Sequence, residues 1–246
     1  MFNKRHIVRT IAATVSILAL SFTAACGSGQ STASNSTDSD DITQQTYKPG
    51  KLTIATGQPA YEPWVMNDKP ESGEGYEAAV AYAVADKLGF KKSDVVWTRT
   101  AFDTAIAPGA KDWDFNIQQF GITDERKKAV DFSSSYYNDS QSVVVKKDSK
   151  FANATKVSDL KDATVGVMVG TLAYDYAKAN IKDDIQTFND DAALAQALDA
   201  GQIDVLVTST VECVYMVQSE QVKDSKVLGR LPDSEDTVSY THLRAH

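Results

Sequence analysis

The chain has 246 residues, with 25 basic and 33 acidic side chains, a net charge of −8 and 42 % hydrophobic residues. A nucleic-acid-binding surface needs an excess of basic charge, so this composition argues against nucleic acid as a partner. Two cysteines do not make a disulfide framework, and the three histidines lie at the two ends of the chain. No metal site is therefore predicted, and nothing in the sequence indicates a cofactor.

The first 25 residues have the pattern of a secretory signal. Basic residues at the start are followed by an apolar run over 11–22, which is too short to span a membrane as a mature helix, and then by small residues. Cys26 directly after Ala24-Ala25 looks like a bacterial lipobox, although Thr23 stands where Leu is usual. We expect Cys26 to be lipidated; the alternative is an ordinary secretory signal. Without residues 1–25, which hold three of the 25 basic residues, the net charge becomes −11.

Residues 26–46 are predicted to be a flexible tether. Their sequence after the cysteine is GSGQSTASNSTDSDDITQQT, which has one isolated Ile and no aromatic residue. Such a composition cannot bury a core. The segment would hold a folded body, beginning at residue 47, away from the membrane.

The first part of the body, 47–140, shows alternating strand and helix patterns. β-branched runs and alternation predict strands, and apolar residues at i, i+4 spacing with a following Gly predict the longer helix. The segment GITDERKKAVDF, which contains Arg126, follows the last of these strands. The predicted strands are 51–56, 94–99 and 113–117, and the predicted helices are 75–88 and 102–107.

The second part, 141–237, repeats the alternation. Asp190 or Asp191 is predicted to cap one of its helices. Cys213 lies in the apolar run VECVYMV and is predicted to be a small buried hydrophobe. The predicted strands are 142–147, 164–169, 184–188 and 203–208, and the predicted helices are 172–179 and 192–200.

Strand-helix alternation predicts parallel sheets covered by helices, and two consecutive series predict two α/β lobes. Ligands of such sheets bind at the carboxyl ends of the strands. Arg126, Thr171 and Ser209 all follow strands, so they are candidates for a common site.

From about Leu52 to Pro232 the sequence resembles the extracellular solute-binding proteins of family 3, which supply polar amino acids to ABC importers. The resemblance is carried by GITDERKKAVDFS, by Tyr136-Tyr137, by VGVMVGT and by GQIDVLVT, in that order. It implies an α/β, two-lobed periplasmic-binding-protein-like fold of type II, with lobe 1 over 47–140 and lobe 2 over 141–237.

The resemblance also assigns the site. Arg126 would grip the ligand's α-carboxylate, because a planar guanidinium gives a carboxylate two parallel hydrogen bonds; Lys127 and Lys128 would be surface charges. Thr171 and Leu172, at the start of a helix, would meet the same carboxylate. Lobe 1 residues that line the pocket would be Gln119, Gly121, Tyr61 and Trp64, with plain core packing as the alternative for the two aromatic residues.

Ser209 departs from the family pattern. Many members have an Asp there that pairs with the ligand's ammonium, and a buried ammonium without a carboxylate is costly. Either Glu212 or Glu77 substitutes for it, or the ligand lacks a free α-amino group.

The far end, VSYTHLRAH, resembles the translation of a transposase sequencing adapter. We expect 238–246 to be a non-native tail. Because the family completes lobe 1 after the second crossover, lobe 1 is expected to be incomplete at the C-terminus.

The function implied is a non-enzymatic, monomeric, lipid-anchored receptor for an amino acid or similar small carboxylate. It would act on the extracellular face of the cytoplasmic membrane, or in the periplasm, and deliver its ligand to an ABC permease. The alternative is a cyclohexadienyl-dehydratase-like enzyme on the same fold, which would need a positioned general acid such as Glu77 or Glu212.

Overall fold

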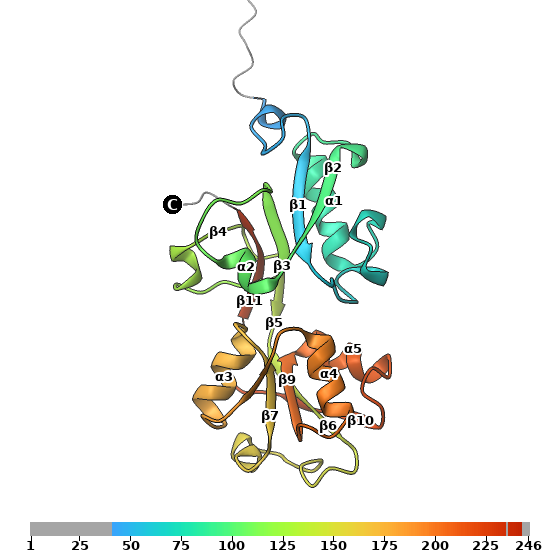
Figure 1. Cartoon of the computed structure of the whole chain (residues 1–246), viewed down its shortest axis with the longest axis vertical. Helices are drawn as coiled ribbons and strands as arrows, with labels where there is room; N and C mark the ends of the chain where they lie inside the picture. Colours follow the sequence, from blue (N-terminus) through green and yellow to red (C-terminus); the bar gives the residue numbers. More distant parts are fainter. Residues whose placement is uncertain (1–40, 235, 243–246) are drawn as a thin grey trace, which may run out of the picture. The chain divides into compact units, whose positions relative to one another are not determined.

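The computed structural model describes residues 41–234 and 236–242, which form two β-sheets with helices packed against them (Figure 1). The first sheet has six strands in the order β2-β1-β3-β11-β4, with β5 paired to β11. Its strands are β1 (Leu52–Gly57), β2 (Val95–Thr100), β3 (Phe115–Gly121), β4 (Asp131–Phe132), β5 (Tyr137–Asp139) and β11 (Asp236–His242).

The second sheet has five strands in the order β10-β6-β9-β7-β8. Its strands are β6 (Gln141–Lys146), β7 (Val165–Met168), β8 (Gln186–Phe188), β9 (Val205–Ser209) and β10 (Ser225–Arg230). We call the first sheet with its helices lobe 1 and the second sheet with its helices lobe 2. The chain passes from lobe 1 to lobe 2 between β5 and β6, and returns between β10 and β11.

Five α-helices and six short 3-10 helices are present in the described part of the chain. The α-helices are α1 (Tyr76–Lys87), α2 (Phe102–Ile106), α3 (Leu172–Asn180), α4 (Asp191–Asp199) and α5 (Thr210–Gln218). The 3-10 helices are Ile42–Gln44, Met66–Asp68, Pro70–Ser72, Lys92–Asp94, Arg126–Lys128 and Val157–Leu160. None of the helices in this part of the chain combines the length and the apolar composition that a bilayer crossing requires.

The cores follow from the alternation of side chains along the strands. In lobe 2, Val205 and Val207 pack with α3 on one face of the sheet, whereas Leu206 packs with α4 and α5 on the opposite face. In lobe 1, α1 buries Ala81 and Ala85 against β1 and β3. Each sheet is thus anchored by helices, so that the ends of its strands are held in fixed positions.

The two-lobed α/β architecture is confirmed, but the prediction of parallel sheets is wrong in part. β1 pairs in parallel with β2 and β3, and β7 in parallel with β8 and β9. β6 is antiparallel to β9 and to β10, and β11 is antiparallel to β3. These antiparallel strands lie next to the two crossovers between the lobes, β5 to β6 and β10 to β11. A parallel neighbour usually requires a connecting helix, and neither crossover contains one among its described residues.

One α-helix and one strand of lobe 2 were not predicted, α5 and β10. The run that contains Cys213 forms α5, and Cys213 is fully buried in it, as expected for a small hydrophobe.

β3 begins at Phe115, two residues later than predicted. Asp190 caps α4 by accepting the Ala193 N–H at 2.8 Å.

The last described strand, β11, lies within the first sheet. It pairs with β3, β4 and β5, with Val238 opposite Gly121. The sequence predicts that lobe 2 ends at residue 237 and that 238–246 are a non-native tail. The observed strand β11 spans this predicted boundary. The origin of 238–246 and the completeness of lobe 1 stay predictions.

Candidate functional site

A cavity of about 80 Å³ is lined by residues of both lobes. Its walls are the carboxyl ends of β1, β3, β7 and β9 and the first turns of α3, α4 and α5. Strand ends and helix N-termini meet here, as the alternation predicts. The sequence-predicted residues that line it are Tyr61, Gln119, Gly121, Arg126, Thr171, Leu172 and Ser209.

Arg126 is the only basic residue that lines this cavity among the described residues. Its side chain is 9 % exposed, and its guanidinium donates to the Gly121 carbonyl at 2.9 Å and to the Gly170 carbonyl at 2.9 Å. The guanidinium carbon also lies 5.7 Å from the centre of the Phe102 ring. A buried guanidinium held in one orientation, after β3, can present its planar edge to an anion.

The neighbouring lysines have a different role. Lys127 pairs with Asp124 and Lys128 with Glu125, and all four side chains are exposed. Exposed pairs of this kind contribute only about 0–1 kcal/mol. The prediction that these two lysines are surface charges is confirmed.

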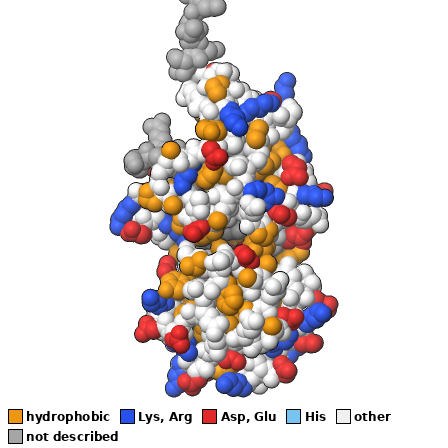
Figure 2. Space-filling model, viewed as in Figure 1, with side chains coloured by type: hydrophobic (Ala, Val, Ile, Leu, Met, Phe, Trp, Pro, Cys, Tyr) orange, Lys and Arg blue, Asp and Glu red, His pale blue; other side chains and the backbone are white. Residues whose placement is uncertain are grey.

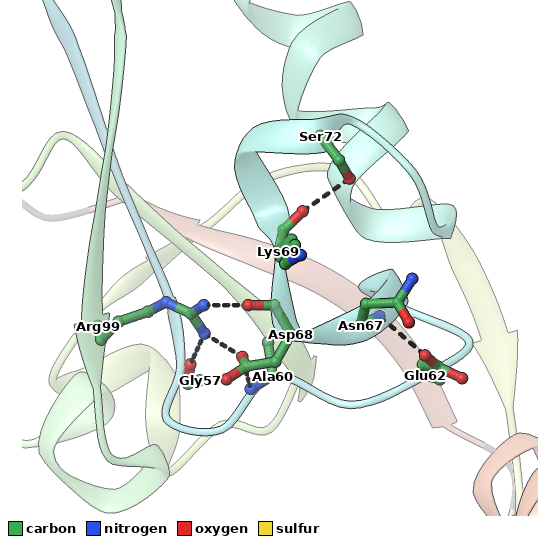
Figure 3. A network of polar contacts seen from close by, with 8 residues as sticks. All are labelled: Gly57, Ala60, Glu62, Asn67, Asp68, Lys69, Ser72 and Arg99. Carbon is green, nitrogen blue, oxygen red and sulfur yellow. Dashed lines mark hydrogen bonds and ion pairs between the residues drawn. The ribbon is translucent and has the colours of Figure 1, made fainter.

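Figure 3 shows how Arg99 holds the loop between Gly57 and Asp68, and by its sequence position Tyr61 belongs to this loop. Arg99 donates to the Gly57 carbonyl at 2.7 Å and forms an ion pair with Asp68 at 2.5 Å. Asp68 in turn accepts the Ala60 N–H at 2.8 Å. This network fixes both ends of the loop (Figure 3). From the loop, the Tyr61 hydroxyl reaches α4 of lobe 2 and accepts the Ala192 N–H at 3.4 Å. Burial raises the pKa of Tyr61, so the phenol stays protonated.

Gln119 is held from within lobe 1 by Glu77. The fully buried Glu77 carboxylate accepts the Gln119 N–H at 2.8 Å, the Gln119 side-chain amide and the Tyr136 hydroxyl. Gln119 has a left-handed φ of 51°, which is unfavourable for a residue with a side chain and which the hydrogen bond to its N–H helps to maintain. Burial raises the pKa of Glu77 to about 7, against the effect of these hydrogen bonds.

Thr171 is the N-cap of α3. Its hydroxyl oxygen accepts the Tyr174 N–H at 3.2 Å, and the hydroxyl donates to the Met168 carbonyl at 2.8 Å. The hydroxyl proton is therefore used within lobe 2, which differs from the expected direct contact with a carboxylate. What the first turn of α3 offers an anion is its N–H groups and the positive end of the helix.

Ser209 likewise caps its helix. Its hydroxyl oxygen accepts the Glu212 N–H at 3.2 Å at the start of α5. One turn into the helix, the Glu212 carboxylate accepts the Thr208 hydroxyl at 2.8 Å and lines the cavity. Of the two residues proposed to replace the missing Asp, Glu212 reaches the cavity, and Glu77 is not among its lining residues.

Trp64 does not line the cavity. It is 1 % exposed, and its ring packs edge-on against Tyr76 and Tyr137, with centroid distances of 5.9 Å and 5.4 Å. The placement of Trp64 in the pocket is therefore wrong, and the core-packing alternative describes its position. The two aromatic residues of AYEPW separate because the loop turns between them.

The lining residues that sequence reasoning missed include Asp139, Gln141 and Asp191. The first two lie at the crossover between β5 and β6, and the third is the first residue of α4. Burial raises the pKa values of Asp139, Asp191 and Glu212, so their protonated forms are favoured more than in water. No local motif marks these positions, because the fold and not the sequence spacing brings them together.

A second cavity of about 1140 Å³ lies alongside and shares Asp139 and Leu172 with the first. Its only charged lining residues within the described chain are Asp139 and Arg230. The smaller cavity is the better candidate because buried groups of both signs converge on it. At about 80 Å³ it is below the roughly 300–1,000 Å³ of typical ligand sites, so a ligand larger than this volume would need its walls to separate.

Other site types find little support in residues 41–234 and 236–242. No group of three or more His, Cys, Asp or Glu side chains there is arranged to hold a metal ion. On the face drawn in Figure 2, acidic and basic side chains are interspersed, without the continuous basic surface that nucleic acid requires.

Comparisons with known proteins identify the family and agree with the two-lobed fold. The model of the bacterial extracellular solute-binding proteins, family 3, matches residues 52–168. The L-cystine-binding protein TcyJ of Escherichia coli (strain K12) is 31 % identical over 160 residues, which are 64 % of this chain and 59 % of TcyJ. A glutamine-binding protein of Geobacillus stearothermophilus is 31 % identical over 225 residues, 83 % of this chain and 82 % of the relative.

Among solved structures, the chain is similar to the ancestral amino acid-binding protein AncCDT-1, a precursor of cyclohexadienyl dehydratase. The TM-score is 0.68 at 28 % sequence identity, over 83 % of this chain and 85 % of that chain. The match to TcyJ spans less than two thirds of that relative's length, whereas the matches to the glutamine-binding protein and to AncCDT-1 span most of theirs.

Proposed function

The chain belongs to family 3 of the bacterial extracellular solute-binding proteins, and we propose on this premise that it captures an amino acid, or a similar small carboxylate, for an ABC importer. The observation that carries the proposal is the buried Arg126 guanidinium opposite the first turn of α3, in a cavity between two lobes. The names of the relatives, a cystine-binding and a glutamine-binding protein, support the same ligand class.

In this proposal the ligand's carboxylate takes the place of a protein carbonyl. The Arg126 guanidinium donates to the Gly170 carbonyl of lobe 2 in the structure. A carboxylate would accept that hydrogen bond more strongly, since charge-assisted pairs are about twice as strong as neutral ones. It would at the same time meet the N–H groups at the start of α3, and the walls of the small cavity would separate to make room.

The test is a panel of the twenty amino acids, first by thermal shift and then by calorimetry, on the unmodified protein and on Arg126→Ala. We expect at least one amino acid to raise the melting temperature and the variant to lose most of its affinity. Lys127→Ala, in the same charge cluster but exposed and paired with Asp124, is the matched control and should bind normally. If no small carboxylate binds the unmodified protein, the proposed function is wrong.

We further propose that Cys26, which lies outside the described residues, is lipidated and anchors the chain at the extracellular face of the membrane. The permease would be the protein partner, and the receptor would be a monomer. Cys26→Ala should release the protein from the membrane fraction, whereas Cys213→Ala, at the buried cysteine, should not. A Cys26→Ala protein that still sediments with membranes would contradict the anchor.

The relatives named above are binding proteins, which favours a non-enzymatic role. One feature of the site supports the enzyme alternative: Glu212 is a buried acid that lines the cavity and could serve as the general acid. The similar structure AncCDT-1 is, in addition, a precursor of a dehydratase. Incubation with cyclic precursors of aromatic amino acids, followed by ultraviolet absorbance of an aromatic product, separates the two. We expect no product, and product that disappears in Glu212→Gln would establish the enzyme.

A further inference from the structure

Three carboxylates line the small cavity. Asp139 comes from the end of β5, Asp191 from the first residue of α4 and Glu212 from the first turn of α5. Their exposed fractions are 8 %, 5 % and 8 %. They face a lining that contains one cation, Arg126, among the described residues. The cavity therefore carries more acidic groups than its own basic group can balance.

Within the described residues, these carboxylates have neutral donors only. Asp139 accepts the Ser140 N–H at 2.7 Å, Glu212 accepts the Thr208 hydroxyl at 2.8 Å, and the same hydroxyl lies 3.5 Å from Asp191. The ion pairs of the described chain involve other residues. Buried acids without a cation are costly, and proteins normally pair them. A positive charge in the cavity would supply the missing partner.

An independent observation points to a ligand at the same place. Gln141, the first residue of β6, lines the cavity and is 5 % exposed. Its backbone is held by Ser234, but its side-chain amide has no hydrogen bond among the contacts of the described residues. A buried amide normally has a partner. The Gln141 side chain lines the same cavity as the carboxylates, so its amide can serve as a donor and an acceptor for a ligand there.

We propose that Asp139, Asp191, Glu212 and the Gln141 amide form a subsite for cationic groups, and that the ligand is an amino acid with a positively charged side chain. The inference rests on the proposed function, which places the α-carboxylate at Arg126. That carboxylate cancels the guanidinium charge, and the lobe 2 carboxylates then receive the α-ammonium and the side-chain cation. Ser209 caps α5 through its hydroxyl oxygen, and in this proposal the carboxylates take the place of the Asp that many family members have at its position.

The measurement is calorimetry on the unmodified protein with matched ligand pairs of nearly equal shape, L-arginine against L-citrulline and L-lysine against L-norleucine. Each pair differs by one positive charge on the side chain. A hydrogen bond to a charged group contributes more binding free energy than one between neutral groups. We therefore expect the cationic member of each pair to bind roughly 10- to 150-fold more tightly than the neutral member. Because the subsite is buried, salt should screen it less than it screens an exposed ion pair. The preference for the cationic ligand should therefore decrease only a little at high salt.

Two variants locate the preference. The carboxylate that receives the side-chain cation is located by Asp191→Asn and Glu212→Gln: one of them should reduce the affinity for the cationic ligand by about 10-fold or more and leave the affinity for its neutral partner nearly unchanged. The variant that removes the partner of the α-ammonium should weaken both ligands without lowering the melting temperature of the free protein. Asp184→Asn, an exposed aspartate of the same lobe, removes one negative charge elsewhere and should change neither. A purely structural role would instead reduce the binding of both ligands and lower the melting temperature.

The outcomes separate this inference from the proposed function. If citrulline, norleucine or another neutral amino acid binds as tightly as its cationic partner, the cation subsite is wrong and the amino-acid receptor stands. If no amino acid binds the unmodified protein, the proposed function fails and the inference with it. A preference for the cation that persists in both variants would also overturn the assignment to these carboxylates.

Discussion

Substitution of Glu77 by Gln should change how the stability of the protein depends on pH. Glu77 is fully buried in the first turn of α1 and accepts hydrogen bonds from Gln119 and Tyr136. Burial is the largest influence on this carboxyl group, and it raises the pKa from the ordinary value of 4.5 to about 7. The folded protein thus binds this proton more tightly than the unfolded chain does.

The sign and size of the effect follow from this difference. The stabilising contribution of protonated Glu77 is fully present below about pH 4.5 and is lost as the pH rises through about 7. At 1.36 kcal/mol per pKa unit, the difference between 4.5 and about 7 corresponds to about 3 kcal/mol of unfolding free energy. Gln has nearly the same shape and does not titrate, so Glu77→Gln should lack this contribution to the pH dependence.

The assay is urea denaturation of both proteins, followed by tryptophan fluorescence, at several pH values between 4.5 and 8. The unfolding free energy of the unmodified protein minus that of Glu77→Gln should fall by about 3 kcal/mol across this range. Other buried acids are present in both proteins and cancel in the difference. Glu125→Gln, at an exposed carboxylate paired with Lys128, is the control and should show no comparable fall. A difference between the proteins that stays constant with pH would refute the reasoning.

Three further substitutions test the site and its scaffold. Arg126→Lys keeps the charge but loses the planar pair of donors, so calorimetry should show at least about a 10-fold loss of affinity; unchanged affinity would remove the carboxylate role. Gly166→Ala places a Cβ 2.4 Å from the Ile203 Cδ1 atom in the lobe 2 core, and urea denaturation should show a loss of about 1–3 kcal/mol; a neutral result would mean that the core can relax. Thr171→Val removes the cap of α3 and should cost about 0.5–2 kcal/mol of stability, while a stability equal to that of the unmodified protein would contradict the capping role.

Local patterns in the sequence were sufficient for much of the fold. The helix over 75–88 was found because its apolar stripe and terminal Gly are local signals, and α1 occupies nearly that range. A helix cap is also a local signal, so the sequence predicted that Asp190 or Asp191 caps α4, and Asp190 does so. Arg126 and Ser209, which follow strands, both line the small cavity, as expected because strand ends converge in α/β sheets.

The rest depended on tertiary packing, which local patterns do not contain. α5 was not predicted because Val211, Val214 and Val217 are β-branched and favour strands, yet the Ser209 cap and the burial of Cys213 and Met216 give a helix. Asp139 and Asp191 are more than 50 positions apart and meet only in the folded chain. The Trp64 assignment failed because two aromatic residues three positions apart can lie on opposite sides of a loop.

The central claim is that the small cavity binds an amino acid with its carboxylate at Arg126. A crystal structure of the complex with the amino acid that calorimetry finds to bind most tightly is the most direct test. We predict ligand carboxylate oxygens about 3 Å from the Arg126 guanidinium and from the N–H groups of the first turn of α3, with the Arg126–Gly170 hydrogen bond broken. A ligand in the larger cavity near Arg230, or one whose carboxylate makes no contact with Arg126, would contradict the account.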